Sequence, residues 1–203
     1  MYKLTDRMLQ NLEANLRRFH ELFQGGRCQA WQLEELIAKA IRSDFNKNEK
    51  VLWKGNGHDI GADILINDNV EIQIKSGKIE KGCLVLSGHR LGRFKENLER
   101  ITEFLDKSSY MIIAVPYYTE DDQRGQSYNY QLCYFDTQFL RLGDFRKWKK
   151  EPDKKGREKE GYFAENEHGV RLSLHPSMSW QIWWRIPMDI IPENNKTRIV
   201  KII

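Results

Sequence analysis

The stretch DILINDNVEIQIKS, residues 63–76, has a short polar break between an apolar run, Ile64-Leu65-Ile66, and a run that alternates apolar and polar side chains. The break is Asn67-Asp68-Asn69, and the run after it repeats with a period of two, the pattern of a β-strand. Successive side chains of a strand point to opposite faces, so this strand has one apolar face and one polar face. The apolar face carries Val70, Ile72 and Ile74, and the polar face carries Glu71, Gln73 and Lys75.

The polar break predicts a β-hairpin with a three-residue loop, because Asn tolerates the left-handed backbone conformation that such loops require. If Ile66 pairs with Val70, Asp63 falls directly opposite Gln73. Cross-strand partners share a face and have Cβ atoms roughly 5 Å apart. A two-residue loop would shift the register by one residue and would place Asp63 on the other face.

With the three-residue loop, Asp63, Gln73 and Lys75 cluster at the open end of the hairpin, whereas Glu71 lies near its turn. Carboxylate, amide and carbonyl oxygens can hold a Mg²⁺ ion that takes the rest of its shell from water and a phosphate. Such an ion polarises the phosphoryl oxygen and lowers the pKa of a bound water. A nearby ammonium can orient that water and stabilise negative charge on the phosphate. Alternation alone also fits a solvated hairpin, and the Asp on the opposite strand is what favours a hydrolytic site.

The rest of the chain has the patterns of alternating helices and strands. Apolar side chains at three- and four-residue spacing predict helices, and short extended or alternating runs predict strands. We expect helices over 4–24, 29–45 and 91–107, and strands over 50–54, 60–66, 70–76, 83–87, 110–115, 128–136, 161–166, 170–174 and 180–186. Pro116 is expected to end the strand over 110–115. The order predicts an α/β fold with a central mixed sheet flanked by helices. We expect one domain over 1–203, with a core over about 29–116 and a β-rich, basic embellishment over about 137–203.

The composition excludes several classes of protein. The chain has 203 residues and a net charge of +4, and none of its apolar runs approaches the roughly 18 residues of a membrane span. The first residues lack the apolar segment of a secretory signal, and three scattered cysteines suggest reduced thiols, so we expect a cytoplasmic protein. Residues 146–160 carry eight Lys or Arg against four Asp or Glu. This run is either a solvated loop or a contact for a polyanion.

The stretches GADILI (61–66) and EIQIK (71–75) resemble the Asp…(Asp/Glu)-x-Lys signature of the PD-(D/E)xK nuclease superfamily. The resemblance covers about residues 29–116 and implies the αβββαβ core of restriction endonucleases. It implies that Asp63 and Gln73 bind Mg²⁺ and that Lys75 positions the attacking water. The chain departs from the pattern at two positions, where Ala62 replaces the proline and Gln73 replaces an acid.

Glu34 is the candidate for a compensating acid, because it lies on the border of the apolar stripe of the helix over 29–45. The family often has a glutamate in a sequence context similar to Leu33-Glu34-Glu35-Leu36-Ile37. A surface Glu near a helix start is the alternative explanation. A second register, ranked lower, takes Glu71 as the second acid with Gln73 in the place of the lysine.

Two segments carry candidate DNA-contacting side chains. The first surrounds SGHRLGR, residues 87–93, and the second is the tail loop over 175–181. Arg suits guanine edges and phosphates, and Gln and Ser are common groove-reading residues. The candidates are Lys78, Ser87, His89, Arg90, Arg93, Ser177, Ser179 and Gln181. The alternative for the first segment is a helix start capped by Ser87, and His89 lacks partners at zinc-ligand spacing.

The resemblance implies a Mg²⁺-dependent type II restriction endonuclease that cuts a short palindrome in double-stranded DNA. Two-fold symmetry of the site is met by a homodimer with one active site per strand. Two alternatives remain open. One is a nuclease similar to the Holliday-junction resolvases, against which the long tail argues. The other is a non-catalytic DNA-binding module with a degenerate nuclease core.

Overall fold

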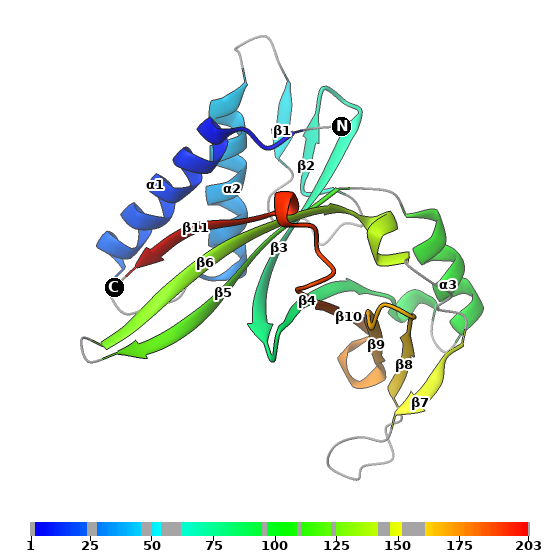
Figure 1. The fold of residues 1–203 in the computed structure, drawn as a ribbon. Helices are drawn as coiled ribbons and strands as arrows, with labels where there is room; N and C mark the ends of the chain where they lie inside the picture. The colour runs from blue at the N-terminus through cyan, green and yellow to red at the C-terminus, as the bar shows by residue number, and fades with distance from the viewer. Residues whose placement is uncertain are drawn as a thin grey trace. The chain divides into compact units, whose positions relative to one another are not determined.

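The computed structural model describes residues 3–23, 28–45, 50–53, 62–94, 97–108, 111–122, 125–141, 147–151 and 161–202. These residues form an α/β fold with a mixed β-sheet and three α-helices (Figure 1). The chain packs as two compact units. The first unit consists of Met1–Lys78, Tyr110–Phe135 and Pro192–Ile203, and the second consists of Ile79–Ser109 and Asp136–Ile191. The core expected over 29–116 thus contributes to both units, and the last strand of the chain belongs to the first.

The first unit contains two helices and most of the mixed sheet. Its elements are α1 (Asp6–Leu22), α2 (Ala30–Asp44), β1 (Val51–Trp53), β2 (Ile64–Ile66), β3 (Val70–Glu80), β5 (Met111–Asp122), β6 (Gly125–Asp136), a 3₁₀ turn (Glu193–Asn195) and β11 (Lys196–Ile202). The last two residues of β3, Ile79 and Glu80, and the last residue of β6, Asp136, belong to the second unit. The strand order is β11-β6-β5-β3, and β2 pairs with β3 and β1 with β2. β3 and β5 run parallel, whereas the pairs β2–β3, β1–β2 and β6–β11 are antiparallel.

The apolar stripes of the two helices explain where the core of this unit forms. Thr5 caps α1, since its Oγ1 accepts a hydrogen bond from Met8 N at 3.1 Å. α1 and α2 lie side by side, and Asn11 Nδ2 donates to Ser43 Oγ across them at 2.6 Å (Figure 1). The helices share one hydrophobic cluster with the apolar face of β3, where Ile74 has no exposed surface. This burial fixes which face of β3 points into the interior.

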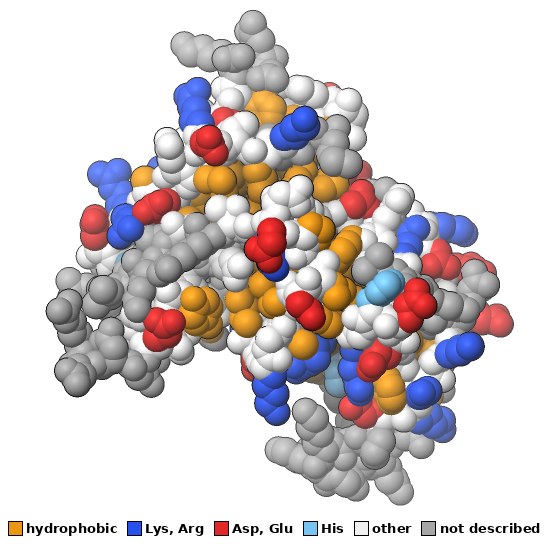
Figure 2. All heavy atoms as spheres, viewed as in Figure 1, with side chains coloured by type: hydrophobic (Ala, Val, Ile, Leu, Met, Phe, Trp, Pro, Cys, Tyr) orange, Lys and Arg blue, Asp and Glu red, His pale blue; other side chains and the backbone are white. Residues whose placement is uncertain are grey.

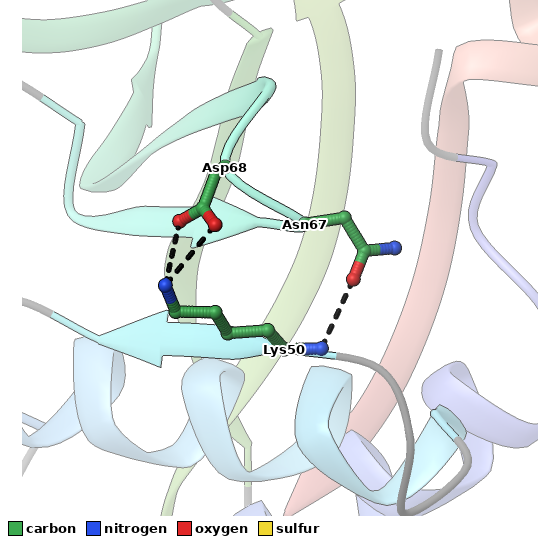
Figure 3. Close-up of polar contacts among 3 residues, drawn as sticks. All are labelled: Lys50, Asn67 and Asp68. Atoms are coloured by element: carbon green, nitrogen blue, oxygen red, sulfur yellow. Dashed lines mark hydrogen bonds and ion pairs between the residues drawn. The ribbon is translucent and has the colours of Figure 1, made fainter.

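The turn between β2 and β3 sets the register of the hairpin. Asn67 and Asp68 have φ angles of 47° and 58°, the left-handed region that a short polar loop requires. Lys50 holds this turn through its backbone N, which donates to Asn67 Oδ1 at 3.0 Å, and through its Nζ, 3.0 Å from both carboxylate oxygens of Asp68 (Figure 3). Ile66 pairs with Val70, so the expected three-residue loop is confirmed.

The second unit is a five-stranded antiparallel sheet with one helix. Its elements are β4 (Cys83–Arg90), a 3₁₀ turn (Gly92–Phe94), α3 (Leu98–Lys107), a 3₁₀ turn (Thr137–Arg141), β7 (Lys149–Glu151), β8 (Gly161–Glu165), β9 (Arg171–His175), a 3₁₀ turn (Pro176–Met178) and β10 (Gln181–Pro187). The strand order is β4-β10-β9-β8-β7. Buried and partly exposed side chains alternate along strands such as β9 and β10, so one face of the sheet is apolar. That face carries the buried residues Leu84, Leu86, Ala164, Leu172, Leu174, Ile182, Trp184 and Ile186.

Several element boundaries differ from the sequence-based expectations. β5 was expected to end at Pro116 but continues to Asp122, so this boundary was wrong. Pro removes one N–H from the ladder, and the parallel pairing with β3 holds on both sides of it, at Val115–Ser76 and Tyr117–Lys78. The third helix begins at Leu98 with an Asn97 cap, later than expected, because a 3₁₀ turn occupies 92–94. The sequence patterns did not predict β7 and β11.

The surface of the described residues carries both signs of charge. On the face drawn in Figure 2, acidic and basic side chains are interspersed, with hydrophobic groups between them. No helix within the described ranges is long and apolar enough to cross a membrane.

Candidate active site

Asp63 sits where the hairpin opens, one residue before β2. The pairing of Ile64 with Ile72 places Asp63 level with Gln73, as the register predicts. Its carboxylate oxygen Oδ2 accepts a hydrogen bond from the backbone N–H of Ile74 at 2.7 Å. β2 begins only at Ile64, so the Asp63 side chain accepts the hydrogen bond of the Ile74 N–H that a backbone carbonyl of a longer β2 would accept. Its position is therefore fixed by the backbone of the neighbouring strand.

Lys75 is the cationic partner of this carboxylate. Its Nζ lies 4.0 Å from Asp63 Oδ2, and the two side chains are 21% and 27% exposed. Burial raises the pKa of Asp63, while the charge of Lys75 and the hydrogen bond from Ile74 lower it, and burial has the largest effect. The acid and the ammonium group thus meet in a partly desolvated setting that still has access to solvent.

Glu34 reaches the same electrostatic environment from the first turns of α2. Burial raises its pKa, and the charge of Asp63 raises it further, whereas Lys75 lowers it. A carboxyl group whose ionisation is disfavoured by a neighbouring carboxylate would be stabilised in its charged form by a nearby cation. The charges of Asp63 and Lys75 therefore both act on Glu34.

Gln73 and Glu71 occupy different surroundings on the same strand. Gln73 is only 3% exposed, so its amide lies below the surface at the level of Asp63. Glu71 is exposed and pairs with Leu65, at the turn end of the hairpin. Two residues along a strand correspond to roughly 7 Å, so Glu71 is displaced from Asp63 toward the turn. This placement favours the register in which Gln73, rather than Glu71, occupies the position of the second acid.

The oxygen atoms of the Asp63, Glu34 and Gln73 side chains are of the kind that a magnesium ion accepts as ligands. Within the described residues, no group of three or more His, Cys, Asp or Glu side chains is arranged to hold a metal ion. Mg²⁺ needs only one or two protein carboxylates when water and substrate phosphate complete its shell. Asp63 and Glu34 could supply two hard oxygen donors to such an ion, and the Gln73 amide could supply a neutral third. The free cysteines Cys28 and Cys133 are buried in apolar surroundings.

The candidate DNA-contacting residues fall mostly in the second unit. Ser87, His89 and Arg90 lie on β4, Arg93 lies in the 3₁₀ turn after it, Ser179 follows the turn over 176–178, and Gln181 opens β10. Lys78 lies on β3 in the first unit, opposite Tyr117. The side chain of Ser177 lies outside the described set, as does most of the basic run over 146–160.

Two groupings emerge among these residues. Arg90 and Gln181 are direct cross-strand partners. The His89 ring lies 5.7 Å from the Phe104 ring, edge to face, and the guanidinium of Arg93 lies 5.0 Å from the centre of the same ring. Phe104 thus supports two basic side chains, a role that its helical spacing alone did not indicate.

His175 begins the tail loop over 175–181 that the sequence indicates, but it was not among the individual candidates. It pairs with Gln181 from the other side of β10. The alternation of Arg171, Ser173 and His175 on β9 was the available signal, because it places all three on the polar face of one strand.

The comparisons with known proteins identify no relative of this chain. No protein-family model, no curated protein and no solved structure matches it.

Proposed function

We propose that the protein is a Mg²⁺-dependent endodeoxyribonuclease of the PD-(D/E)xK type, acting on double-stranded DNA as a type II restriction enzyme. The observation that carries this proposal is the Asp63–Lys75 pair, 4.0 Å apart, on a β-hairpin whose other face is buried in the core. A carboxylate can bind a cation, and an ammonium group beside it can orient a water and stabilise charge on a phosphate.

Each residue has a distinct role in this proposal. Asp63 and Glu34, with the amide or carbonyl of Gln73, would hold Mg²⁺, which supplies Lewis-acid polarisation of the phosphate. Lys75 would orient the attacking water and stabilise negative charge that develops on the phosphoryl oxygens. The hydrogen bond from Ile74 to Asp63 keeps the carboxylate oriented before substrate arrives. A homodimer would bring one such site to each strand of a palindrome.

A second candidate function is a DNA-binding module that has lost catalysis. The observation that favours it is Gln73, a neutral side chain that is 3% exposed at the position where the family has an acid. With only two carboxylates in the site, cation affinity would be lower than in a site with three. Binding without cleavage in Mg²⁺ would support this candidate.

The proposal is tested by digestion of supercoiled and linear plasmid DNA with Mg²⁺, compared with EDTA. Asp63→Asn keeps an acceptor for Ile74 N–H but removes the charge, and Lys75→Gln removes the ammonium. Each should lower the cleavage rate by about 10²-fold or more while DNA binding in a gel-shift assay is retained. Asp68→Asn is the matched control, since it removes an acid from the turn of the same hairpin, where Asp68 pairs with Lys50.

The pattern of products separates the candidates. Discrete fragments and a dimer by analytical ultracentrifugation support a type II restriction enzyme. Preferential cutting of a four-way junction over linear duplex supports a resolvase. Full cleavage by either Asp63→Asn or Lys75→Gln would refute the site assignment.

A further inference from the structure

A row of three polar side chains crosses the end of the sheet in the second unit. Arg90 is the last residue of β4, Gln181 is the first of β10, and His175 is the last of β9. Arg90 pairs with Gln181, and Gln181 pairs with His175. Cross-strand partners share a face, so the three side chains stand side by side, on the face opposite that of the buried Ile182 and Leu174.

The spacing of this row matches the repeat of duplex DNA. Neighbouring strands lie about 4.8 Å apart, so the row spans about 10 Å from Arg90 to His175. Three base-pair steps of about 3.4 Å cover the same length. The major groove is about 12 Å wide and admits a two-stranded ribbon. The tip of the β9–β10 hairpin is a two-stranded ribbon of this kind, and the end of β4 lies beside it.

A β-bulge in β4 determines which residue joins the row. The register runs from Trp183–Ser87 to Gln181–Arg90, so Gly88 and His89 together lie opposite Ile182. A Cβ on Gly88 would lie 3.3 Å from the Ile182 Cβ, which indicates why a glycine fits there. Without the bulge, His89 rather than Arg90 would face Gln181. Bulges commonly redirect a side chain in this way next to functional sites.

The loop between β9 and β10, which joins His175 to Gln181, has an unusual backbone conformation. Ser179 and Trp180 are consecutive non-glycine residues with φ angles of 57° and 59°, and a left-handed conformation is rare for a residue as bulky as Trp. Leu91 N donates to Trp180 O at 3.1 Å, and the Trp180 ring stacks on Tyr162 with a centroid distance of 5.9 Å. Strain that the surroundings enforce is characteristic of preorganised binding sites.

Other arginines of the second unit form ion pairs or hydrogen bonds among the described residues, whereas the side chains of the row do not. Arg171 is paired with Glu151 at 2.7 Å, Arg185 with Glu80 at 3.5 Å, and Arg141 donates to the carbonyl of Leu105. Within the described part of the chain, the side chains of Arg90, Gln181 and His175 make no hydrogen bond or ion pair. Arg90 is exposed, and the other two are half-buried.

We propose that Arg90, Gln181 and His175 form the base-reading row of this protein, which inserts into the major groove of duplex DNA and determines the preferred sequence. This inference rests on the proposed action on DNA and goes beyond it by assigning specificity to three strand-end residues. The fork of Arg90 suits the O6 and N7 atoms of a guanine, and the amide of Gln181 suits the N6 and N7 atoms of an adenine. The spacing of the whole row, about three base-pair steps, places its targets within four consecutive base pairs.

The test is selection of bound duplexes from a random-sequence DNA library by the full chain in EDTA, followed by sequencing. Wild type should enrich a short motif. Arg90→Ala and Gln181→Ala should each lose the preference at one position of the motif and bind the motif about 5- to 150-fold more weakly. Binding to unrelated duplex should stay within about twofold. Arg90→Lys keeps the charge but not the bidentate fork, and it should lose the same preference.

The matched control is Arg100→Ala, which removes an exposed arginine of α3 and changes the net charge equally. It should leave the motif unchanged. The inference is overturned if wild type enriches no motif or if Arg90→Ala and Gln181→Ala both keep the motif. It is also overturned if Arg90→Ala weakens all duplexes equally with a smaller salt dependence, since that is the signature of a phosphate contact.

Cleavage of plasmid DNA by the same variants separates this inference from the proposed function. Enrichment of a motif without Mg²⁺-dependent cutting by wild type would leave the reading row intact and refute the nuclease. Cutting by wild type with an unchanged motif in the Arg90 and Gln181 variants would refute the row and leave the nuclease intact.

Discussion

The coupling between Lys75 and Asp63 in the metal-free protein is a direct measure of the arrangement on which the site depends. At 4.0 Å, two unit charges attract by about 4 kcal/mol at an effective dielectric constant of 20 and by about 1 kcal/mol in water. The side chains are 21% and 27% exposed, so the setting lies between these limits. We expect a coupling free energy of about 2 kcal/mol.

The Lys50–Asp68 pair provides a control in the same hairpin. Its Nζ–O distance is shorter, 3.0 Å, but the side chains are 55% and 60% exposed. Exposed pairs contribute about 0.2–1 kcal/mol, because water and salt screen them. If burial outweighs distance, the longer Lys75–Asp63 pair is the stronger of the two.

The assay is a double-mutant cycle for each pair, with urea unfolding followed by tryptophan fluorescence at pH 7 in EDTA. Lys75→Gln, Asp63→Asn and the double variant form one cycle, and Lys50→Gln, Asp68→Asn and their double variant form the other. A coupling below about 0.3 kcal/mol for Lys75–Asp63 would be within the error of additivity. That result, or a value smaller than that of the control pair, would refute the reasoning that places both groups in one desolvated site.

Three further outcomes follow from the titrating groups. Burial lowers the pKa of His20, so the folded state resists its protonation; the urea midpoint should fall as the pH drops below about 6.5, and His20→Gln should reduce that loss. Because burial and Asp63 raise the pKa of Glu34, its ionised form is disfavoured in the fold, and its contribution to stability falls as the pH rises through the folded pKa. Glu34→Gln should therefore raise the melting temperature of the metal-free protein at pH 7 and weaken its Mg²⁺ binding in calorimetry. Burial raises the pKa of Cys28 and of Cys133 to about 12, so a thiol reagent should modify the half-buried Cys83 first and the other two only on unfolding.

The local order of the hairpin was predictable from the sequence. Side chains that alternate with a period of two point to opposite faces of a strand, and a three-residue polar loop determines how the two strands pair. The placement of Asp63 opposite Gln73 therefore followed from residues 63–76 alone. The stripes of α1 and α2 were predictable for the same reason, because periodicity reports which side of an element is buried. The strand end predicted at Pro116 was wrong because the missing N–H of a proline is a local property of the sequence. Whether the strand continues depends on its pairing with β3, which the local sequence does not show.

The sequence by itself determined the faces of the elements, the hairpin register, and hence the adjacency of an acid and a lysine that are twelve residues apart in the chain and lie on neighbouring strands. Only the tertiary structure decided that α2 brings Glu34 into the field of Asp63 and Lys75, and that a bulge aligns Arg90 with Gln181 and His175. The physical reason is that periodicity constrains directions within one element, whereas distances between elements depend on how buried side chains fill space around them.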